Sequence, residues 1–354
     1  SSLNHNLKSV PLVLTGNRAL QLDDEVRRAA DVLMRRYIAL TGAGLLSACA
    51  TTPLVNSLPA SVVTASGETE PVGTANADAA DDPAIWRNPA DPAKSLIVAT
   101  DKKAGLYVYG LDGKRRGFFA AGLVNNVDLV DLGEEGVIVA ASDRNDPLKG
   151  AIQVFRLDTA TGELSLLGKG QAGTGEGYGF CMARIGGEVR TYSPLKNGTV
   201  SEIAINLAPA LSFRPLRSLR VATQPEGCVV DPRDGTLYVG EETRGIWRFA
   251  PGATEGELVA ETDGKHLVAD VEGLAIWTEG EDGGYLVASS QGDNAYSLYR
   301  LPGMQPAGRF RIGAGKYGAT QETDGIDLIP GNFGPDYSNG LFMAQDGDNQ
   351  PYPQ

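Results

Sequence analysis

The chain has 354 residues, and 31 Lys and Arg against 44 Asp and Glu give it a formal net charge of −13. A surface of this sign repels nucleic acid and anionic lipid, so neither is an expected partner. The 45 Gly and 20 Pro favour a turn-rich all-β protein over a helical one. With two histidines, His5 and His266, a Ser-His-Asp triad or a histidine phosphoenzyme has almost nothing to work with.

The first 67 residues have the pattern of an export segment. Residues 1–33 are expected to be an upstream extension to which no function is assigned. Residues 34–48 combine a basic start, a short apolar run and small residues, which matches a secretory signal peptide. The LSAC ending resembles a bacterial lipobox, which implies cleavage before Cys49 and lipidation of its thiol. Residues 49–67, rich in Thr, Pro, Ala and Ser, are then a flexible tether.

This leader predicts an exported bacterial lipoprotein, at the outer membrane, in the periplasm or on the cell surface. The apolar run is shorter than the roughly 20 residues that a membrane-spanning helix needs. We therefore expect contact with a membrane only through the lipid, and a monomeric protein.

Six polar clusters, each next to a short apolar strand, recur along the rest of the chain. Their markers, separated by 46, 50, 48, 46 and 55 positions, are Asp82, Asp128, Tyr178, Glu226, Glu272 and Asp327. A period of about 40 to 50 residues with several short strands per unit is typical of propeller blades. The sequence predicts an all-β, six-bladed β-propeller over residues 68–354, with about four antiparallel strands per blade. Either residues 61–72 complete the last blade or that blade is truncated.

Charged residues also recur just past the second strand of each unit, as Lys102 and Lys103, Arg144, and Glu241 and Glu242 show. In a propeller such positions lie on a ring around one axis, so the carboxylates should converge at one mouth of the channel. Asp, Glu and amide oxygens suit Ca²⁺ and, without His or Cys, are poor ligands for Zn²⁺. Interleaved cations suit a phosphorylated ligand. The pattern predicts a metal-dependent site for a polyanion.

Ten collinear motifs over about residues 68–350 resemble those of the β-propeller phytases. They are DDPAIW, TDKKAGLYVY, NNVD, YGF, EG at Glu226, GEETRGIW, DVEGL, ASSQG, TDGID and AQDGDN. The resemblance implies six blades and several bound Ca²⁺ ions. It also implies hydrolysis of phytate (myo-inositol hexakisphosphate) by a metal-bound water, which releases phosphate and lower inositol phosphates, with one phosphate site for cleavage and an adjacent one for affinity.

The same resemblance assigns roles to individual residues. The candidate Ca²⁺ ligands are Asp82, Glu226, Glu241, Asp270, Glu272, Gln291, Asp324, Asp327 and Asp346. The candidate catalytic residues are Lys102, Lys103, Arg144, Tyr178, Lys196 and Glu242, and the candidate substrate-binding residues are Asn125, Asn126, Asp128 and Asn294. The chain departs from the family where Asp143 precedes Arg144 and where Asn197 and Gly198 follow Lys196.

Two other functions stay open on the sequence, namely a six-bladed lactonase or esterase with one divalent metal, and a surface-tethered binding propeller without catalysis. Cys181 and Cys228 follow two markers on neighbouring units and could be bonded in an oxidising compartment. One pair supplies no disulfide framework, so two separate buried thiols are the favoured interpretation.

Overall fold

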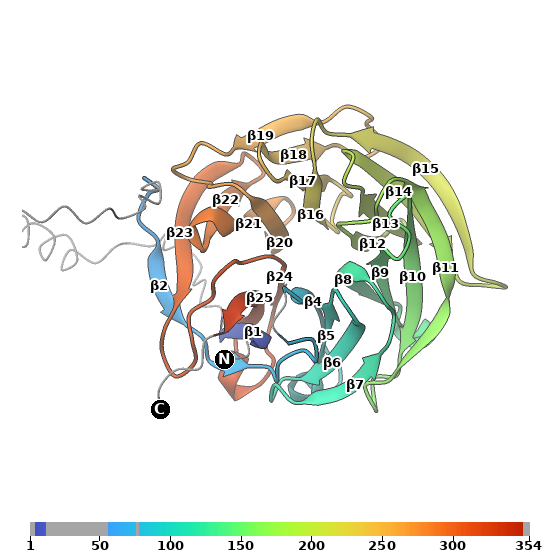
Figure 1. Ribbon diagram of the computed structural model, residues 1–354, viewed down its shortest axis with the longest axis horizontal. Helices are drawn as coiled ribbons and strands as arrows, with labels where there is room; N and C mark the ends of the chain where they lie inside the picture. The colour runs from blue at the N-terminus through green and yellow to red at the C-terminus, as the bar shows by residue number, and fades with distance from the viewer. Residues whose placement is uncertain (1–3, 12–55, 76–77, 350–354) are drawn as a thin grey trace, which may run out of the picture. The chain divides into compact units, whose positions relative to one another are not determined.

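The computed structural model describes residues 4–11, 56–75 and 78–349, and the strands in this part of the chain belong to six sheets. Five sheets are blades of four consecutive antiparallel strands, which stand in a ring with their first strands innermost (Figure 1). The expected all-β propeller is confirmed. The predicted six blades are not confirmed: the structure shows five blades of consecutive strands, and the remaining sheet combines strands from both ends of the described chain.

Each of the five regular blades runs outward from the centre in chain order. The first blade holds β4 (Ala80–Trp86), β5 (Leu96–Asp101), β6 (Gly105–Gly110) and β7 (Arg115–Phe119). The second holds β8 (Val124–Asp131), β9 (Val137–Asp143), β10 (Lys149–Leu157) and β11 (Leu164–Thr174). The third holds β12 (Cys181–Ile185), β13 (Glu188–Pro194), β14 (Thr199–Asn206) and β15 (Ser212–Arg220).

The last two regular blades have the same order. The fourth holds β16 (Pro225–Val230), β17 (Leu237–Glu241), β18 (Gly245–Phe249) and β19 (Glu257–Glu261). The fifth holds β20 (Val271–Glu279), β21 (Gly283–Ser290), β22 (Ala295–Leu301) and β23 (Gln305–Gly313). Parallel to β23, an additional strand, β2 (Ser61–Thr64), lies at the outer edge.

The sixth, composite sheet has the order β24, β25, β1, β3. Its strands are β24 (Ile326–Pro330), β25 (Gly340–Asn349), β1 (Asn4–Pro11) and β3 (Gly67–Glu68). Strand β1 pairs with β25 on one side and with β3 on the other, so it takes the third position from the centre. Residues 4–11, expected to have no role, therefore form part of a sheet, and β2 lies inside the segment expected to be a tether.

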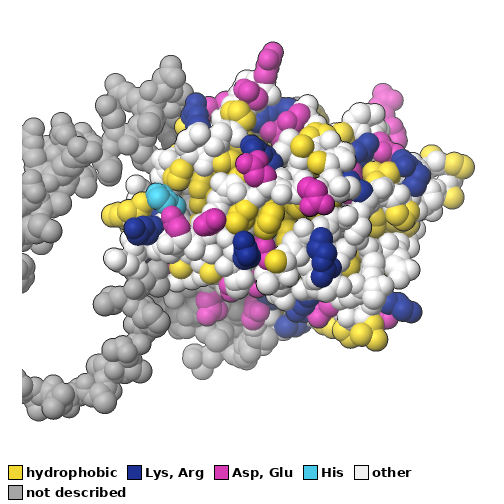
Figure 2. All heavy atoms as spheres, turned by 90° about the horizontal axis from the view of Figure 1, so that it is seen from above, with side chains coloured by type: hydrophobic (Ala, Val, Ile, Leu, Met, Phe, Trp, Pro, Cys, Tyr) yellow, Lys and Arg dark blue, Asp and Glu magenta, His cyan; other side chains and the backbone are white. Residues whose placement is uncertain are grey.

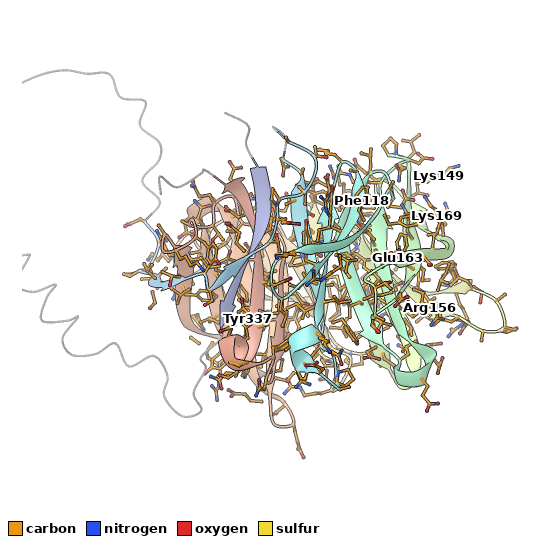
Figure 3. All side chains as sticks on the ribbon, turned by 90° about the horizontal axis from the view of Figure 1, so that it is seen from below. Phe118, Lys149, Arg156, Glu163, Lys169 and Tyr337 are labelled. Atoms are coloured by element: carbon orange, nitrogen blue, oxygen red, sulfur yellow. A yellow bond between two sulfur atoms is a disulfide. The ribbon has the colours of Figure 1, made fainter. Side chains whose placement is uncertain are left out.

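Short 3-10 helices occupy four of the connections: η1 (Pro92–Lys94), η2 (Gly133–Glu135), η3 (Gln291–Asp293) and η4 (Pro335–Tyr337). Within the described ranges, none of the helices has the length and apolar character that crossing a membrane requires. Lys149, at the start of β10, and Tyr337, in η4, lie at opposite ends of the propeller (Figure 3).

The hydrophobic core lies between neighbouring blades. One cluster joins Trp86 and Leu106 of the first blade to Val139 and Phe155 of the second, and all four side chains are buried. These strands alternate apolar and polar positions, so each sheet presents an apolar face to the next. The wall seen in Figure 2 mixes basic, acidic and hydrophobic side chains, so the acidic excess is not gathered on that face.

Cys181 and Cys228 form a disulfide, and the interpretation as two free thiols was wrong. The two residues lie on β12 and β16, the innermost strands of adjacent blades, and their Cα atoms are 5.6 Å apart. Inner strands of a propeller converge on the axis, which brings first-strand residues of successive repeats within bonding distance. The bridge joins the third blade to the fourth beside the central channel.

Candidate active site

The innermost strands of four blades have a β-bulge at the end where they enter the sheet. The interrupted registers lie at Ala80 to Pro83, Val124 to Val127, Pro225 to Cys228 and Val271 to Leu274. A bulge places one extra residue in a strand and turns its side chain out of the regular alternation. The residue pairs inside these bulges are Asp81 and Asp82, Asn125 and Asn126, Glu226 and Gly227, and Glu272 and Gly273. The polar markers thus sit where the backbone itself is redirected.

Two glycines show how tightly adjacent bulges approach one another. A Cβ on Gly227 would lie 2.0 Å from the carbonyl oxygen of Glu272 in the next blade. A Cβ on Gly325, just before β24, would lie 2.2 Å from Asp82 Oδ1. Neither contact is possible for a residue with a side chain. Because the backbones nearly touch, the acidic side chains beside these glycines are forced together.

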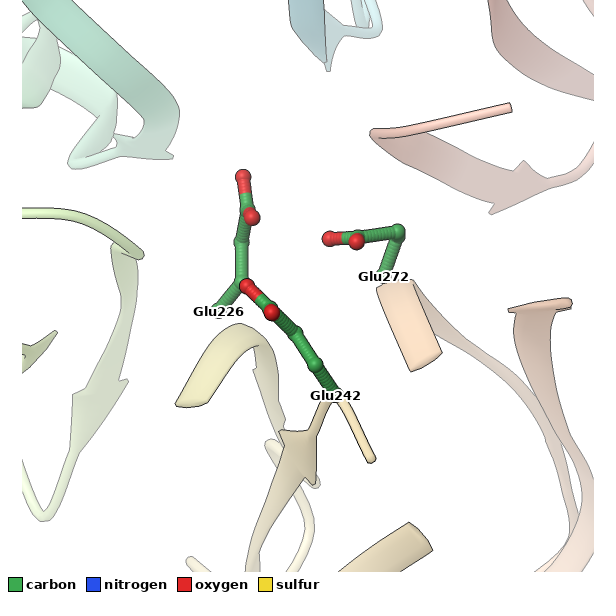
Figure 4. Close-up of side chains that lie close together, drawn as sticks. All are labelled: Glu226, Glu242 and Glu272. Carbon is green, nitrogen blue, oxygen red and sulfur yellow. The ribbon is translucent and has the colours of Figure 1, made fainter. Parts of the chain in front are cut away.

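The carboxylates of Glu226, Glu242 and Glu272 converge as a result (Figure 4). One oxygen from each lies within 4.8 Å of the others, and Glu226 and Glu272 are buried. Burial, followed by the charge of Asp81, raises the pKa of Glu226 to about 7. Burial and then Glu226 raise the pKa of Glu272 well above its usual range. The group is unfavourable as three bare anions and calls for a cation.

A second set of carboxylates surrounds the Lys102 ammonium. Its Nζ lies 2.9 Å from Asp78 Oδ2, 3.1 Å from Asp81 Oδ1 and 3.3 Å from Asp324 Oδ2. Although burial disfavours its charged form, Asp81 and Asp324 raise the pKa of Lys102. Gln291 Nε2 donates to Asp324 Oδ1 at 2.5 Å. The charge of Glu226 contributes to raising the pKa values of both Asp324 and Lys102, so the two carboxylate sets form one acidic half of the site.

The basic half is built around the Tyr178 ring. The Arg144 guanidinium carbon lies 5.4 Å from the ring centroid, and Lys196 Nζ lies 4.5 Å from it. Glu176 pairs with both cations, at 2.5 Å from Arg144 Nη2 and 3.4 Å from Lys196 Nζ. Burial, and then Glu226 and Glu272, raise the pKa of the Tyr178 hydroxyl, which keeps it a neutral donor.

Asn125 connects the two halves. Its Oδ1 accepts from Arg144 Nη1 at 2.6 Å, and its Nδ2 donates to Glu226 Oε1 at 2.7 Å. The side chain is fully buried, so neither bond competes with water. A cation held by Glu226 and an anion held by Arg144 would therefore lie on either side of the Asn125 side-chain amide.

The acidic half fits a hard divalent cation. Among the described residues, no hydrogen-bond partner is found for the buried oxygens Asp81 Oδ2 and Glu272 Oε2, a condition that folded proteins rarely leave uncompensated. The converging donors are carboxylate oxygens, the ligands that Ca²⁺ prefers. Burial raises the pKa of Glu242, and the charge of the nearby, half-buried Asp270 raises it further. Glu226, Glu242 and Glu272, with Asp81 and Asp324 beside them, are the residues that would hold metal.

The predicted Ca²⁺ ligands Asp82 and Asp327 and the predicted substrate-binding residue Asp128 form a separate group around a cavity of about 40 Å³. Asp82 accepts from Val127 N, Asp128 from Met182 N and Asp327 from Ile85 N, so each joins its strand to a neighbouring sheet. Burial is the main cause that raises their pKa values, to about 8 for Asp128 and about 6 for Asp327, and well above the usual range for Asp82.

Several predicted residues are engaged elsewhere. The oxygens of Glu241 accept from the Thr223 backbone and hydroxyl and from Trp247 Nε1, inside the fourth blade. Asp346 Oδ1 accepts from Gln321 N, and Asn294 Oδ1 accepts from Glu322 N. Lys103 is exposed beside the buried Lys102. Asn126 is buried and its Oδ1 accepts from Asn125, so it supports the connecting amide. Cys49 lies outside the described residues.

The sequence analysis missed three acidic residues of the site. Asp81 stands beside the predicted ligand Asp82, and neighbouring side chains of a strand point to opposite faces, so the sequence does not show which of the two faces Lys102. Glu176 lies two positions before Tyr178 in GEGYGF, which was a usable signal. Asp78 lies in a loop with no pattern that could have marked it.

Comparison with known proteins agrees with this arrangement. A family model described as Phytase matches residues 33–353. A relative named 3-phytase, from Bacillus subtilis (strain 168), is 37% identical over 329 residues, which cover 87% of this chain and 86% of the relative. The resemblance to the β-propeller phytases is confirmed.

Proposed function

The chain belongs to the phytase family, which makes it a phosphatase, and we propose that it hydrolyses phytate in a calcium-dependent reaction. Its similarity to a 3-phytase supports the assignment of phytate as the substrate. The same similarity favours phosphate-ester hydrolysis over the lactonase and binding-only alternatives. The products are inorganic phosphate and lower inositol phosphates.

One observation carries the proposal, namely the contact chain from Glu226 through Asn125 to Arg144. It joins a carboxylate group that needs a cation to a guanidinium that suits phosphate oxygens. Phosphoryl transfer depends mainly on positioning and charge neutralisation, so adjoining cation and anion sites are what the reaction requires. A ligand with several phosphates can use both at once.

The chain's own residues have distinct tasks in this reaction. Arg144 and Lys196, both against the Tyr178 ring, would bind the oxygens of a phosphate, and the neutral Tyr178 hydroxyl can donate to a third acceptor. Glu226, Glu242 and Glu272 would hold calcium, which supplies positive charge and Lewis acidity when bound. Lys102 adds a fixed positive charge among Asp78, Asp81 and Asp324.

The covalent change needs no intermediate on the protein. A water oxygen bonds to phosphorus and gives up one proton, the bond from phosphorus to the inositol oxygen breaks, and the departing oxygen takes up one proton in return. The three glutamates are crowded by one another's charge, so they are better suited to holding cations than to attacking phosphorus.

The test is an assay of phosphate release from phytate by protein stripped with EDTA and then supplied with CaCl₂ or MgCl₂. We expect release to need Ca²⁺ and the melting temperature to rise with it. Release that persists in excess EDTA would remove calcium from the proposal, whereas no release from a folded, calcium-loaded protein would remove phytate as the substrate.

We further propose that the composite sheet acts as a sixth blade, because β1 and β3 continue β24 and β25 in the order that the other blades show. Deleting residues 1–11 should lower the melting temperature, since β25 would lose its outer partner and keep only β24. An unchanged melting temperature would argue against β1 as a blade strand.

We propose that the protein is exported, and the Cys181–Cys228 disulfide supports an oxidising compartment. Cleavage before Cys49 would remove β1. A mature lipoprotein therefore cannot use β1 to complete the composite sheet, and the two proposals exclude each other. The intact mass of protein recovered from membranes distinguishes them: a lipid on Cys49 supports maturation, and an intact first strand supports closure.

A further inference from the structure

We propose that Glu176 is an internal competitor of phosphate for Arg144 and Lys196, and that it limits how long product phosphate stays bound. The proposal rests on the phosphatase function proposed above, and it assigns a specificity role to a residue outside the candidate metal site. Its basis is one carboxylate that engages both cations of the basic half.

The contacts resemble those that a bound anion would make. Glu176 Oε1 accepts from Arg144 Nε at 2.9 Å and from Nη2 at 2.5 Å, and it lies 3.4 Å from Lys196 Nζ. The third guanidinium nitrogen of Arg144 is engaged by Asn125. A phosphate that enters this half must therefore take over the donors that Glu176 occupies.

The backbone keeps Glu176 in this place. Gly175 N donates to Leu148 O, and Gly150 N donates to Gly175 O. On the other side, Lys196 N donates to Glu176 O, and Gly177 bridges to Leu195. Because the segment is held by strands on both sides, the carboxylate stays near the cations after a ligand displaces it.

The charges set what can displace it. Two cations and one carboxylate leave a single positive charge in the basic half. A monoanion offers no more charge than Glu176 does, whereas a phosphate monoester carries about two negative charges near neutral pH. Glu176 thereby favours phosphate over singly charged anions and weakens the hold on each phosphate after cleavage.

In the acidic half the internal counter-ion is the Lys102 ammonium, which would compete with a metal cation and not with phosphate. The carboxylates around Lys102 include Asp81 and Asp324, which belong to the metal-binding half, so a metal would draw on the same groups. The contacts found for the Glu176 side chain are to Arg144 and Lys196. Removing its charge should therefore change anion affinity and leave calcium affinity unchanged.

The experiment compares Glu176→Gln with the control Glu188→Gln. Glu188 also pairs with two cations, Arg190 and Arg214, but it lies at the start of β13, whereas Lys196 follows the end of that strand. Inorganic phosphate is titrated calorimetrically into each calcium-loaded protein, and phosphate inhibition of phytate hydrolysis is measured in parallel. We expect E176Q to bind phosphate about three- to tenfold more tightly, with a matching fall in the inhibition constant. E188Q should behave as the wild type.

Unchanged or weaker phosphate binding by E176Q would overturn the proposal and make Glu176 a positioning residue for Arg144. Failure of the wild-type protein to bind phosphate or to act on phytate would instead overturn the proposed function on which the inference depends. An equal tightening in E188Q would show a general effect of net charge and would also overturn it.

Discussion

The acidic half of the site has excess negative charge and the basic half has excess positive charge, and the two are compensated in different ways. In the acidic half, Glu226, Glu242 and Glu272 face one another, while the Lys102 ammonium pairs with Asp78, Asp81 and Asp324, so the remaining negative charge must be neutralised by a bound cation. In the basic half, Arg144 and Lys196 already have Glu176 as counter-ion. The difference indicates that one half depends on a cofactor and the other on exchange between an internal and an external anion.

The largest expected effect comes from Glu226→Gln. Loss of one converging carboxylate should lower kcat by about 100-fold or more, because loss of a residue that only supports a metal ligand already costs about 10- to 100-fold, and it should reduce the rise in melting temperature on adding CaCl₂. Glu241→Gln is the control, because Glu241 bonds Thr223 and Trp247 instead. It should lower stability by about 1–3 kcal/mol and leave the calcium response intact. A normal calcium response in E226Q would separate Glu226 from the metal.

Lys102→Ala tests whether the acidic half needs its own cation before metal binds. Removing the buried ammonium leaves Asp78, Asp81 and Asp324 uncompensated, so the calcium-free protein should lose about 3 kcal/mol of stability by urea unfolding. In excess CaCl₂ the difference in stability between the variant and the wild type should be smaller. Lys103→Ala, at the exposed neighbour, should change stability by less than about 0.5 kcal/mol. Equal losses in both variants would contradict the assignment of Lys102.

The pH dependence of stability in the calcium-free protein tests the separate group formed by Asp82, Asp128 and Asp327. Folding raises the pKa of Asp128 to about 8 and that of Asp327 to about 6, mainly through burial, and Asp82 faces both. The unfolded chain gives up these protons near pH 4. Their stabilising effect is therefore full below about pH 4 and is lost as the pH rises through 6 and 8.

Melting temperatures measured in EDTA should accordingly fall by several degrees between pH 5 and pH 8. Asp128→Asn should flatten the decline, whereas Asp158→Asn, at an exposed turn, should not. A melting temperature that rises over this interval in wild-type protein would contradict the burial of protonated carboxyls.

The smallest effect is expected for Lys196→Ala in the basic half. Lys196 is partly exposed and shares Glu176 with Arg144, so its loss should raise KM for phytate about fivefold with little change in kcat. The calcium-induced rise in melting temperature should stay as in the wild type. A lost calcium response would mean that the two halves are not separable.

Local pattern was sufficient for the blades and for the ring. The predicted markers, from Asp82 to Asp327, all lie on the innermost strands or directly before them. Alternation of apolar and polar residues is a property of the strand itself, and repetition places equivalent positions around one axis. Arg144, Tyr178 and Lys196 were likewise identified from motifs, and the structure brings them together.

The choice between neighbours could not be read from pattern. Asp81 rather than Asp82 contacts Lys102, because a bulge at Ala80 to Pro83 decides which side chain turns toward the mouth of the channel. Glu241 looks as suitable as Glu242 in GEETRGIW, yet Trp247 and Thr223 engage it inside the blade. These outcomes depend on register and on packing partners.

The sequence by itself determined an all-β propeller, the phytase family and the chemistry of a site with both carboxylates and cations, since strand period, repeat length and residue type are local properties. Only the tertiary structure decided that Cys181 and Cys228 are bonded, that β1 pairs with β25, and that Glu176 pairs with both Arg144 and Lys196. Each of these contacts joins residues far apart in the chain or in adjacent sheets. Such contacts exist only once the blades have packed around their axis.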